Sequence, residues 1–126
     1  MSESKEDLFK GINKVKDPKN MTDLEKKHDI TIIAPDTVKA GATFDVELKV
    51  GEAMTHPNMP GHFIQYIELY SGDSLISRFQ MDAATISDPS VKFTIRLPKW
   101  AANELVARER CNLHGVWEAK KSIKIE

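Results

Sequence analysis

Apolar and polar residues alternate along several short segments of the chain. In residues 44–50, and again in residues 91–97, every second side chain is apolar and the residues between are polar or charged. A period of two is typical of a strand that buries one face. Together with other runs rich in β-branched and aromatic residues, this pattern predicts about seven strands, at residues 30–33, 44–50, 62–70, 75–81, 91–97, 105–111 and 116–125.

Turn residues separate these segments, and helix is expected only near the N-terminus. The run at residues 71–74 combines serine, glycine and aspartate, which favour a turn. Thr22 and Glu25 have the spacing of a capping box, and residues 7–12 are compatible with one short amphipathic helical turn. The fold class predicted is therefore all-β, an immunoglobulin-like antiparallel β-sandwich of about seven strands with a short helical N-terminal segment.

Length and charge narrow the class of protein. The chain has 126 residues, which is enough for one domain, and we expect residues 21–126 to form it with residues 1–20 as a polar, partly helical extension. The formal net charge of -1 gives no basic excess, so a nucleic-acid partner is not expected. No apolar run is long enough to span a membrane or to act as a signal core, and no glycine-rich phosphate loop is present. We therefore expect a cytoplasmic protein.

Four histidines and one cysteine are the candidate metal ligands, because each lies in a loop or at the boundary of a predicted element. They are His28, His56, His62, Cys111 and His114. A lone cysteine excludes an intramolecular disulfide and a four-cysteine site within one chain. Cys111 and His114 are three residues apart and precede a glycine, so a turn can bring both onto one ion. A histidine at such a boundary is more often an ordinary surface residue; what favours a site is that none of the five lies on a core face in mid-strand.

The number of candidate ligands bears on the kind of metal. Five ligands exceed the four of a tetrahedral zinc site. They suit iron, because imidazole binds Fe(II), an axial thiolate donates electron density, and a sixth position stays open for a small molecule. A blue-copper site would use two histidines, a cysteine and usually a methionine beyond them. No methionine follows Cys111, so copper is the weaker alternative.

Three segments resemble superoxide reductase of the neelaredoxin type. They are His56-Pro57-Asn58, the run from His62 to Tyr70, and Cys111-Asn112-Leu113-His114-Gly115-Val116-Trp117-Glu118. The resemblance extends, with gaps, from about Glu25 to the C-terminus. It implies a β-sandwich that holds one mononuclear iron per chain, with His28, His56, His62 and His114 as equatorial ligands and Cys111 as the axial ligand. The chain has no cysteines for the extra iron domain of desulfoferrodoxins, so it resembles the single-iron branch.

The N-terminal motif departs from the family pattern. The family usually has a glutamate and a lysine directly before the histidine and a proline two residues after it, whereas here the run is Glu25-Lys26-Lys27-His28, with Ile30 at the proline position. In the family the glutamate binds the oxidised iron and the lysine lies near the open site. The resemblance thus implies catalytic roles for Glu25 and Lys27, with Lys26 as the other candidate lysine. Glu25 has an alternative role as the capping-box partner of Thr22.

The implied activity is the one-electron reduction of superoxide to hydrogen peroxide by an iron that cycles between Fe(II) and Fe(III). Lys27 would attract the anion, and backbone N–H groups of the turn after Cys111 are expected to hydrogen-bond the sulfur. The family's usual electron donor resembles rubredoxin, and relatives are often homotetramers. Two other classes stay open: a non-catalytic one-electron carrier with the same kind of site, using iron or copper, and a plain binding or interaction sandwich with a surface cysteine.

Overall fold

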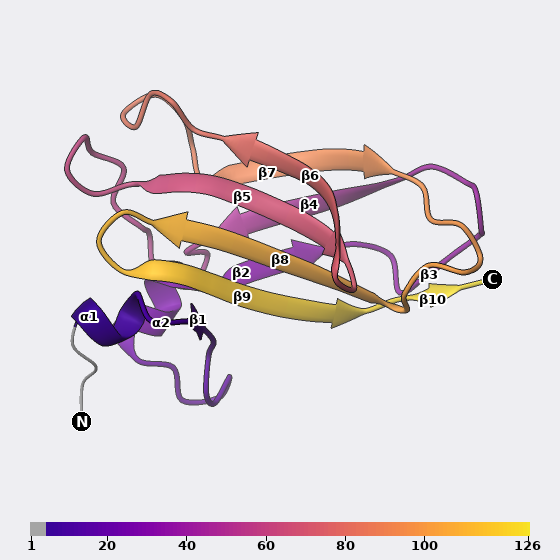
Figure 1. Cartoon of the computed structure of the whole chain (residues 1–126), viewed down its shortest axis with the longest axis horizontal. Coiled ribbons are helices and arrows are strands. Elements are labelled where there is room, and N and C mark those ends of the chain that lie inside the picture. The colour runs from indigo at the N-terminus through magenta and orange to yellow at the C-terminus, as the bar shows by residue number, and fades with distance from the viewer. Residues whose placement is uncertain (1–4) are drawn as a thin grey trace.

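The computed structural model describes residues 5–126, which form two β-sheets packed face to face, with two short helices at one end (Figure 1). The larger sheet has five strands, in the order β1 (Ile12–Asn13), β9 (Gly115–Ser122), β8 (Glu104–Cys111), β5 (Ile64–Ser71) and β6 (Ser74–Gln80). The smaller sheet has three, in the order β2 (Ile30–Ile33), β4 (Phe44–Val50) and β7 (Ser90–Ile95). Within each sheet the strands pair antiparallel, except that the short β1 runs parallel to β9.

The remaining elements lie at opposite ends of the sandwich. The helices α1 (Lys5–Leu8) and α2 (Asp23–His28) lie beside the turn between β8 and β9, on the left of Figure 1. The parallel pair β3 (Thr37–Val38) and β10 (Lys124–Ile125) lies at the other end, where the chain terminates. Among the described residues, neither helix is long and apolar enough to cross a membrane.

The predicted all-β sandwich is confirmed, and each of the seven predicted strands is present with small changes at its ends. The last one is interrupted at Ile123, whose N–H donates to the Asn103 carbonyl oxygen instead of a neighbouring strand. Its last two residues form the separate strand β10. The strands β1 and β3 were not predicted, because two residues are too few to show a period.

The helix predictions are right at α2 and wrong in part at α1. The predicted capping box is present: the Thr22 side chain accepts from the Glu25 N–H, and the Glu25 side chain accepts from the Thr22 N–H. The predicted turn over residues 7–12 instead ends at Leu8, and Ile12 pairs with β9. Residues 1–4 of the predicted extension lie outside the described residues.

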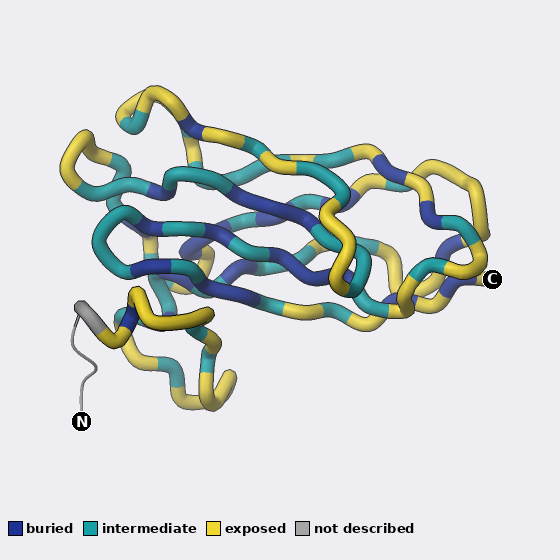
Figure 2. The backbone as a smooth tube through the Cα atoms, in the orientation of Figure 1, coloured by how far each residue is buried: buried dark blue, intermediate teal, exposed yellow. Residues whose placement is uncertain are grey.

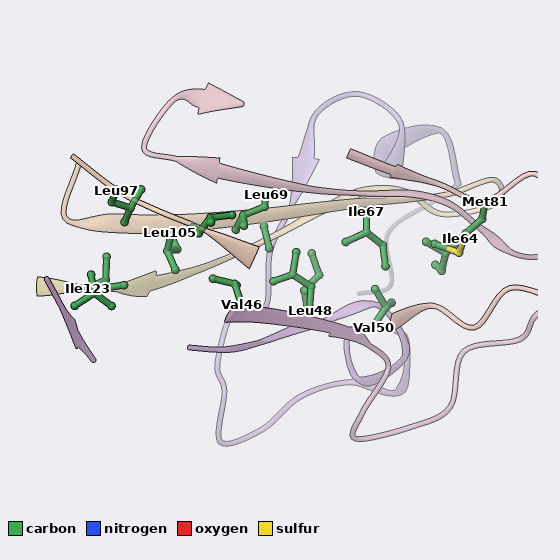
Figure 3. Packing of buried hydrophobic residues seen from close by; sticks show 14 of the residues in the cluster. Val46, Leu48, Val50, Ile64, Ile67, Leu69, Met81, Leu97, Leu105 and Ile123 are labelled. Carbon is green, nitrogen blue, oxygen red and sulfur yellow. The ribbon is translucent and has the colours of Figure 1, made fainter. Parts of the chain in front are cut away.

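The core lies between the two sheets and follows the predicted alternation. Val46 and Leu48 of β4 face Ile67 and Leu69 of β5, and all four side chains are fully buried (Figures 2 and 3). Leu105 of β8 extends the cluster toward the β3–β10 end. The cluster also reaches Cys111, at the end of β8 that lies beside the helices. One continuous core therefore joins an apolar end to an end that carries a thiol.

Candidate metal centre

The five predicted ligands lie close together, on segments at the helical end of the sandwich whose elements are labelled in Figure 1. His28 is the last residue of α2, His56 lies in the loop between β4 and β5, and His62 lies two residues before β5. Cys111 ends β8, and His114 lies in the turn before β9. Three separate segments of the chain thus deliver side chains to one place.

The four imidazole rings form a closed cycle. His28 contacts His56 and His114, and His62 contacts the same two rings; the four centroid distances are 4.8, 4.9, 4.8 and 5.0 Å. Neighbouring rings meet edge to face, with interplanar angles between 64° and 82°. Ligand atoms of His28, His62, Cys111 and His114 all lie within 4.8 Å of one another. His56 joins this group through His28, because their Nε2 atoms are 3.2 Å apart.

The hydrogen bonds of His28 and His56 direct one lone pair of each ring toward a common position that suits a cation. His28 Nδ1 donates to the Leu24 carbonyl at 2.7 Å and His56 Nδ1 donates to the Pro57 carbonyl at 2.6 Å, since a carbonyl oxygen only accepts. In the neutral rings both Nε2 atoms then carry lone pairs, and these face each other at 3.2 Å. Metal–imidazole bonds are about 2.0–2.1 Å long, so two nitrogens bound at right angles to one ion are roughly 3 Å apart.

At neutral pH, protonation of one ring does not relieve the repulsion between the Nε2 lone pairs of His28 and His56. The pKa of His28 is lowered to about 3 and that of His56 to about 4, chiefly by burial and in part by the neighbouring histidines. Both rings are therefore neutral, which is the form that binds metals. A positive ion between the lone pairs fits the donor set better than any neutral occupant.

The thiol lies on the core side of the cycle. Cys111 is fully buried, and its Sγ is 3.5 Å from His114 Nδ1. Burial raises the pKa of the thiol to about 11, although hydrogen bonds from the backbone N–H groups of Leu113 and His114 act in the opposite direction. The N–H groups of this turn thus favour the thiolate, as expected. A thiolate at this depth needs a nearby positive charge, which a bound metal ion would supply.

Asn112 joins the loop that carries His62 to the turn that carries Cys111 and His114. Its Oδ1 accepts from the Phe63 N–H at 2.8 Å, and its Nδ2 donates to the Gly61 carbonyl at 3.0 Å. Asn112 belongs to the motif of residues 111–118, but the sequence alone indicated no role for it. An asparagine is required there because it both donates and accepts across the two segments.

Trp117 contacts the two segments that carry the candidate ligands His28 and His114. Its indole stacks on His28, with ring centroids 5.1 Å apart and planes 20° apart, and its Nε1–H donates to the His114 carbonyl at 3.1 Å. The side chain is buried. Trp117 therefore fixes a ring plane in α2 and the turn after β8 at the same time.

Lys27 precedes His28 in α2, and its backbone lies against the loop that carries His56. Gly51, with a φ of +72°, allows the loop after β4 to approach α2: a Cβ there would lie 2.9 Å from the Lys27 carbonyl oxygen and 3.0 Å from the His56 N. The charge of Lys27 also contributes to the lowered pKa of His56. The catalytic role of Lys27 stays a prediction.

Glu25 occupies its structural role in this structure. It is buried, and its two oxygens accept from the backbone N–H groups of Lys16 and Thr22, each at 2.9 Å. Burial acts to raise the pKa of Glu25, but these bonds outweigh burial and leave the pKa below its ordinary value. The carboxylate is thus engaged at the start of α2, whereas the ligand His28 is at the end.

Glu109 is a buried group that sequence analysis did not single out. It lies on β8 two residues before Cys111, is fully buried, and neither carboxyl oxygen has a hydrogen-bond partner among residues 5–126. Burial raises its pKa well above the ordinary value, and the charge of Asp29 raises it further. The signal was available, since a glutamate stands where the alternation of Leu105 and Ala107 predicts an inward apolar residue.

The comparison with protein families identifies the class of this sandwich and its histidine–cysteine cluster. The model of the desulfoferrodoxin family matches residues 20–120, which is most of the chain. The chain therefore belongs to the desulfoferrodoxin family.

Individual relatives match nearly the full length. A protein of Methanocaldococcus jannaschii is 41% identical over 118 residues, which cover 92% of this chain and 96% of that protein. Neelaredoxin of Megalodesulfovibrio gigas is 28% identical over 118 residues, covering 80% of this chain and 89% of its own. The solved structure of a superoxide reductase (neelaredoxin) from Ignicoccus hospitalis is 34% identical, with a TM-score of 0.77 over 98% of this chain and 100% of that one.

Proposed function

We propose that this chain is a superoxide reductase that holds one iron ion in the histidine–cysteine cluster. The proposed ligands are His28, His56, His62 and His114 around the ion and Cys111 on the core side. The observation that carries the proposal is the closed cycle of four imidazoles over one buried thiol. Family membership and the superoxide reductases among the relatives support it independently.

The bound iron would supply the single electron that superoxide, together with two protons, needs to become hydrogen peroxide. The protein residues provide charge and access. Neutral imidazoles add no negative charge, so only the thiolate offsets the charge of the ion, and the site stays attractive to an anion. His28 and His56 are buried, whereas His62 and His114 are half-buried, so superoxide would approach on their side. Lys27 would add to the attraction and could help deliver a proton.

Binding of Glu25 to the oxidised iron, the role implied by the family, stays a prediction. Binding through one oxygen would break at least one of the two backbone bonds of the carboxylate. A change in the spectrum of the oxidised iron that occurs on Glu25→Ala but not on Asn13→Ala, with the spectrum of the reduced protein unchanged, would support it.

The partners and setting belong to the same proposal. We expect a rubredoxin-like electron donor, a homotetrameric assembly and a cytoplasmic location. The iron domain would span residues 21–126, with residues 1–20 as its N-terminal extension. Because the approach side is half-buried rather than enclosed, a small donor protein could come near His62 and His114 without a large rearrangement.

Metal analysis combined with optical spectroscopy tests the proposal. We expect about one iron per chain and a thiolate-to-iron charge-transfer band that appears on oxidation and shifts when azide is added. Cys111→Ser is the control, because a band due to the thiolate must vanish in that variant. Protein that binds no iron would overturn the proposal. An iron spectrum that azide leaves unchanged would instead indicate a saturated site and a non-catalytic electron carrier.

A further inference from the structure

The N-terminal segment is joined to the metal centre at two points. We call residues 8–16 the strap. The strap lies at the helical end of the sandwich, where it contacts both β9, which follows the turn that carries His114, and the helix α2 that carries His28 (Figure 1). The family model begins at residue 20, so the strap lies outside the part of the chain that the family match covers.

The first anchor is Asn13, which holds the strap to the His114 turn. Its Nδ2 donates to the Leu8 carbonyl at 2.8 Å and to the Val116 carbonyl at 2.9 Å, with a third, longer contact to the His114 carbonyl at 3.5 Å. Asn13 thus closes the strap on itself and on the strand that begins just after the ligand.

The approach of the strap to this turn is close enough to require a glycine. Gly115 follows His114 and has a φ of +79°. A Cβ at this position would lie 2.3 Å from the Leu8 carbonyl oxygen. Leu8 itself is 2% exposed, so this end of the strap is packed as well as hydrogen-bonded.

The second anchor is Glu25, which holds the strap to α2. The carboxylate accepts from the Lys16 N–H at the end of the strap and from the Thr22 N–H at the start of the helix. The helix is only six residues long and ends at His28. A shift of its first turn therefore moves the ligand at its last residue.

We propose that Asn13 and Glu25 are positioning residues, which act through the strap to hold His114 and His28 in place relative to each other. The two histidines are far apart in the chain and reach the site on separate elements. The strap joins these elements by a path of a few residues with an anchor at each end. This inference rests on the metal site of the proposed function and adds to it a role for Glu25 that is not ligation.

A double-mutant cycle on the iron-loaded protein tests this role. The variants are Asn13→Ala, Glu25→Gln and the double variant, and the quantity measured is the rate of iron release to a chelator at constant pH. Each single variant should release iron about tenfold faster, because each loses hydrogen bonds that anchor the strap. The double variant should release iron little faster than the singles, since a strap freed at one end no longer transmits the other anchor.

The matched controls are Asn103→Ala and Glu47→Gln, which change the same residue types outside the strap and should keep the wild-type rate. Asn13→Ser, which keeps one donor, serves if Asn13→Ala does not fold, and circular dichroism checks the sandwich in each variant. If the effects of the two single variants multiply, so that the double variant releases iron about a hundredfold faster, the proposed role of the strap is wrong. It is also wrong if the single variants release iron at the wild-type rate.

The spectrum of the oxidised iron gives a readout that separates positioning from ligation. If Glu25 acts through the strap, Glu25→Gln and Asn13→Ala change this spectrum in the same way. A change confined to Glu25→Gln would make Glu25 a ligand and overturn the proposal. Wild-type protein without iron would overturn the proposed function and this inference together, whereas iron-loaded protein with multiplying effects overturns the strap alone.

Discussion

The two ends of β8 are equally buried but are stabilised by different means. Leu105 and Ala107 lie at one end of the strand and Glu109 and Cys111 at the other, on the same face, and all four are fully buried. The apolar pair gains stability from burial alone. The polar pair consists of a carboxyl without a hydrogen-bond partner among the described residues and a thiol whose pKa is raised to about 11.

The difference shows how one sandwich separates stability from chemistry. The β3–β10 end of the core is an ordinary apolar interior and needs no further component. The helical end brings together lone pairs, a thiol and a neutral carboxyl, which are costly to bury in the absence of a cation. We therefore expect substitutions at the two ends to have different consequences.

The largest expected effect is that of Cys111→Ser. A serine hydroxyl does not ionise near neutral pH, so the site would lose its only thiolate. Reductase turnover should fall by roughly a hundredfold or more, given that even outer-shell changes at metal sites cost 10–100-fold. Pulse radiolysis with a superoxide absorbance readout measures this, and retained turnover would reject Cys111 as the axial ligand.

Leu105→Ala, in contrast, should lower the stability of the fold and leave the iron site unchanged. Removing a fully buried leucine side chain at the apolar end should lower the free energy of unfolding by about 2–5 kcal/mol. Iron content per folded chain and the charge-transfer band should stay unchanged, since Cys111 is six residues further along the strand. Denaturant titration and metal analysis check the two halves of the prediction, and a loss of iron would show that the two ends are not separate.

The third prediction concerns pH and metal-free protein. The pKa values of His28 and His56 are about 3 and 4 in the fold, against about 6.5 in an unfolded chain. Below pH 6.5 the unfolded state takes up protons that the folded state does not, so stability falls as the pH falls toward 4. The slope is roughly 1.4 kcal/mol per pH unit for each histidine. Urea titrations at pH 7 and pH 5 measure it, and equal stabilities would contradict the neutral-histidine assignment.

Glu109→Leu should stabilise the metal-free protein by about 1–3 kcal/mol, because it removes a buried polar group that has no hydrogen-bond partner among the described residues. Glu68→Leu is the matched control. Glu68 is also buried, but it accepts from Arg78 and from the Tyr70 hydroxyl, so its loss should destabilise. The same sign for both variants in thermal unfolding would count against this account of Glu109.

Lys27→Ala should have the smallest effect. We expect the second-order rate with superoxide to fall a few-fold and to depend less on salt, because one attractive charge near His56 is lost. Lys26→Ala is the control and should leave both quantities near the wild-type values. If Lys26→Ala gives the larger change, the role belongs to Lys26.

The fold was predictable where the hydrophobic pattern is periodic. The strands of residues 44–50 and 91–97 follow from alternation alone, and the capping box at Thr22 follows from residue spacing. The pairs β1–β9 and β3–β10 were not predictable, because two-residue parallel strands depend on tertiary contacts that leave no local pattern.

The candidate site was predictable as a set of residue types but not as a working arrangement. Four histidines and a cysteine at element boundaries indicated the ligands. The roles of Asn13 and Asn112 were not visible, since each depends on carbonyl and N–H groups from distant segments. Glu25 shows the limit most clearly: its spacing allowed a capping and a ligating role, and only the bond to the Lys16 N–H reveals what it also connects.

The stacking of Trp117 on His28 gives the protein an internal optical probe. The chain has two tryptophans, and the other, Trp100, is 87% exposed in the loop after β7. An indole in van der Waals contact with a ligand of a transition-metal ion loses its excited state by transfer to the ion, whereas a solvent-exposed indole far from it keeps its emission. Fluorescence from the buried indole therefore reports occupancy of the site in unmodified protein, with the exposed indole as the internal standard.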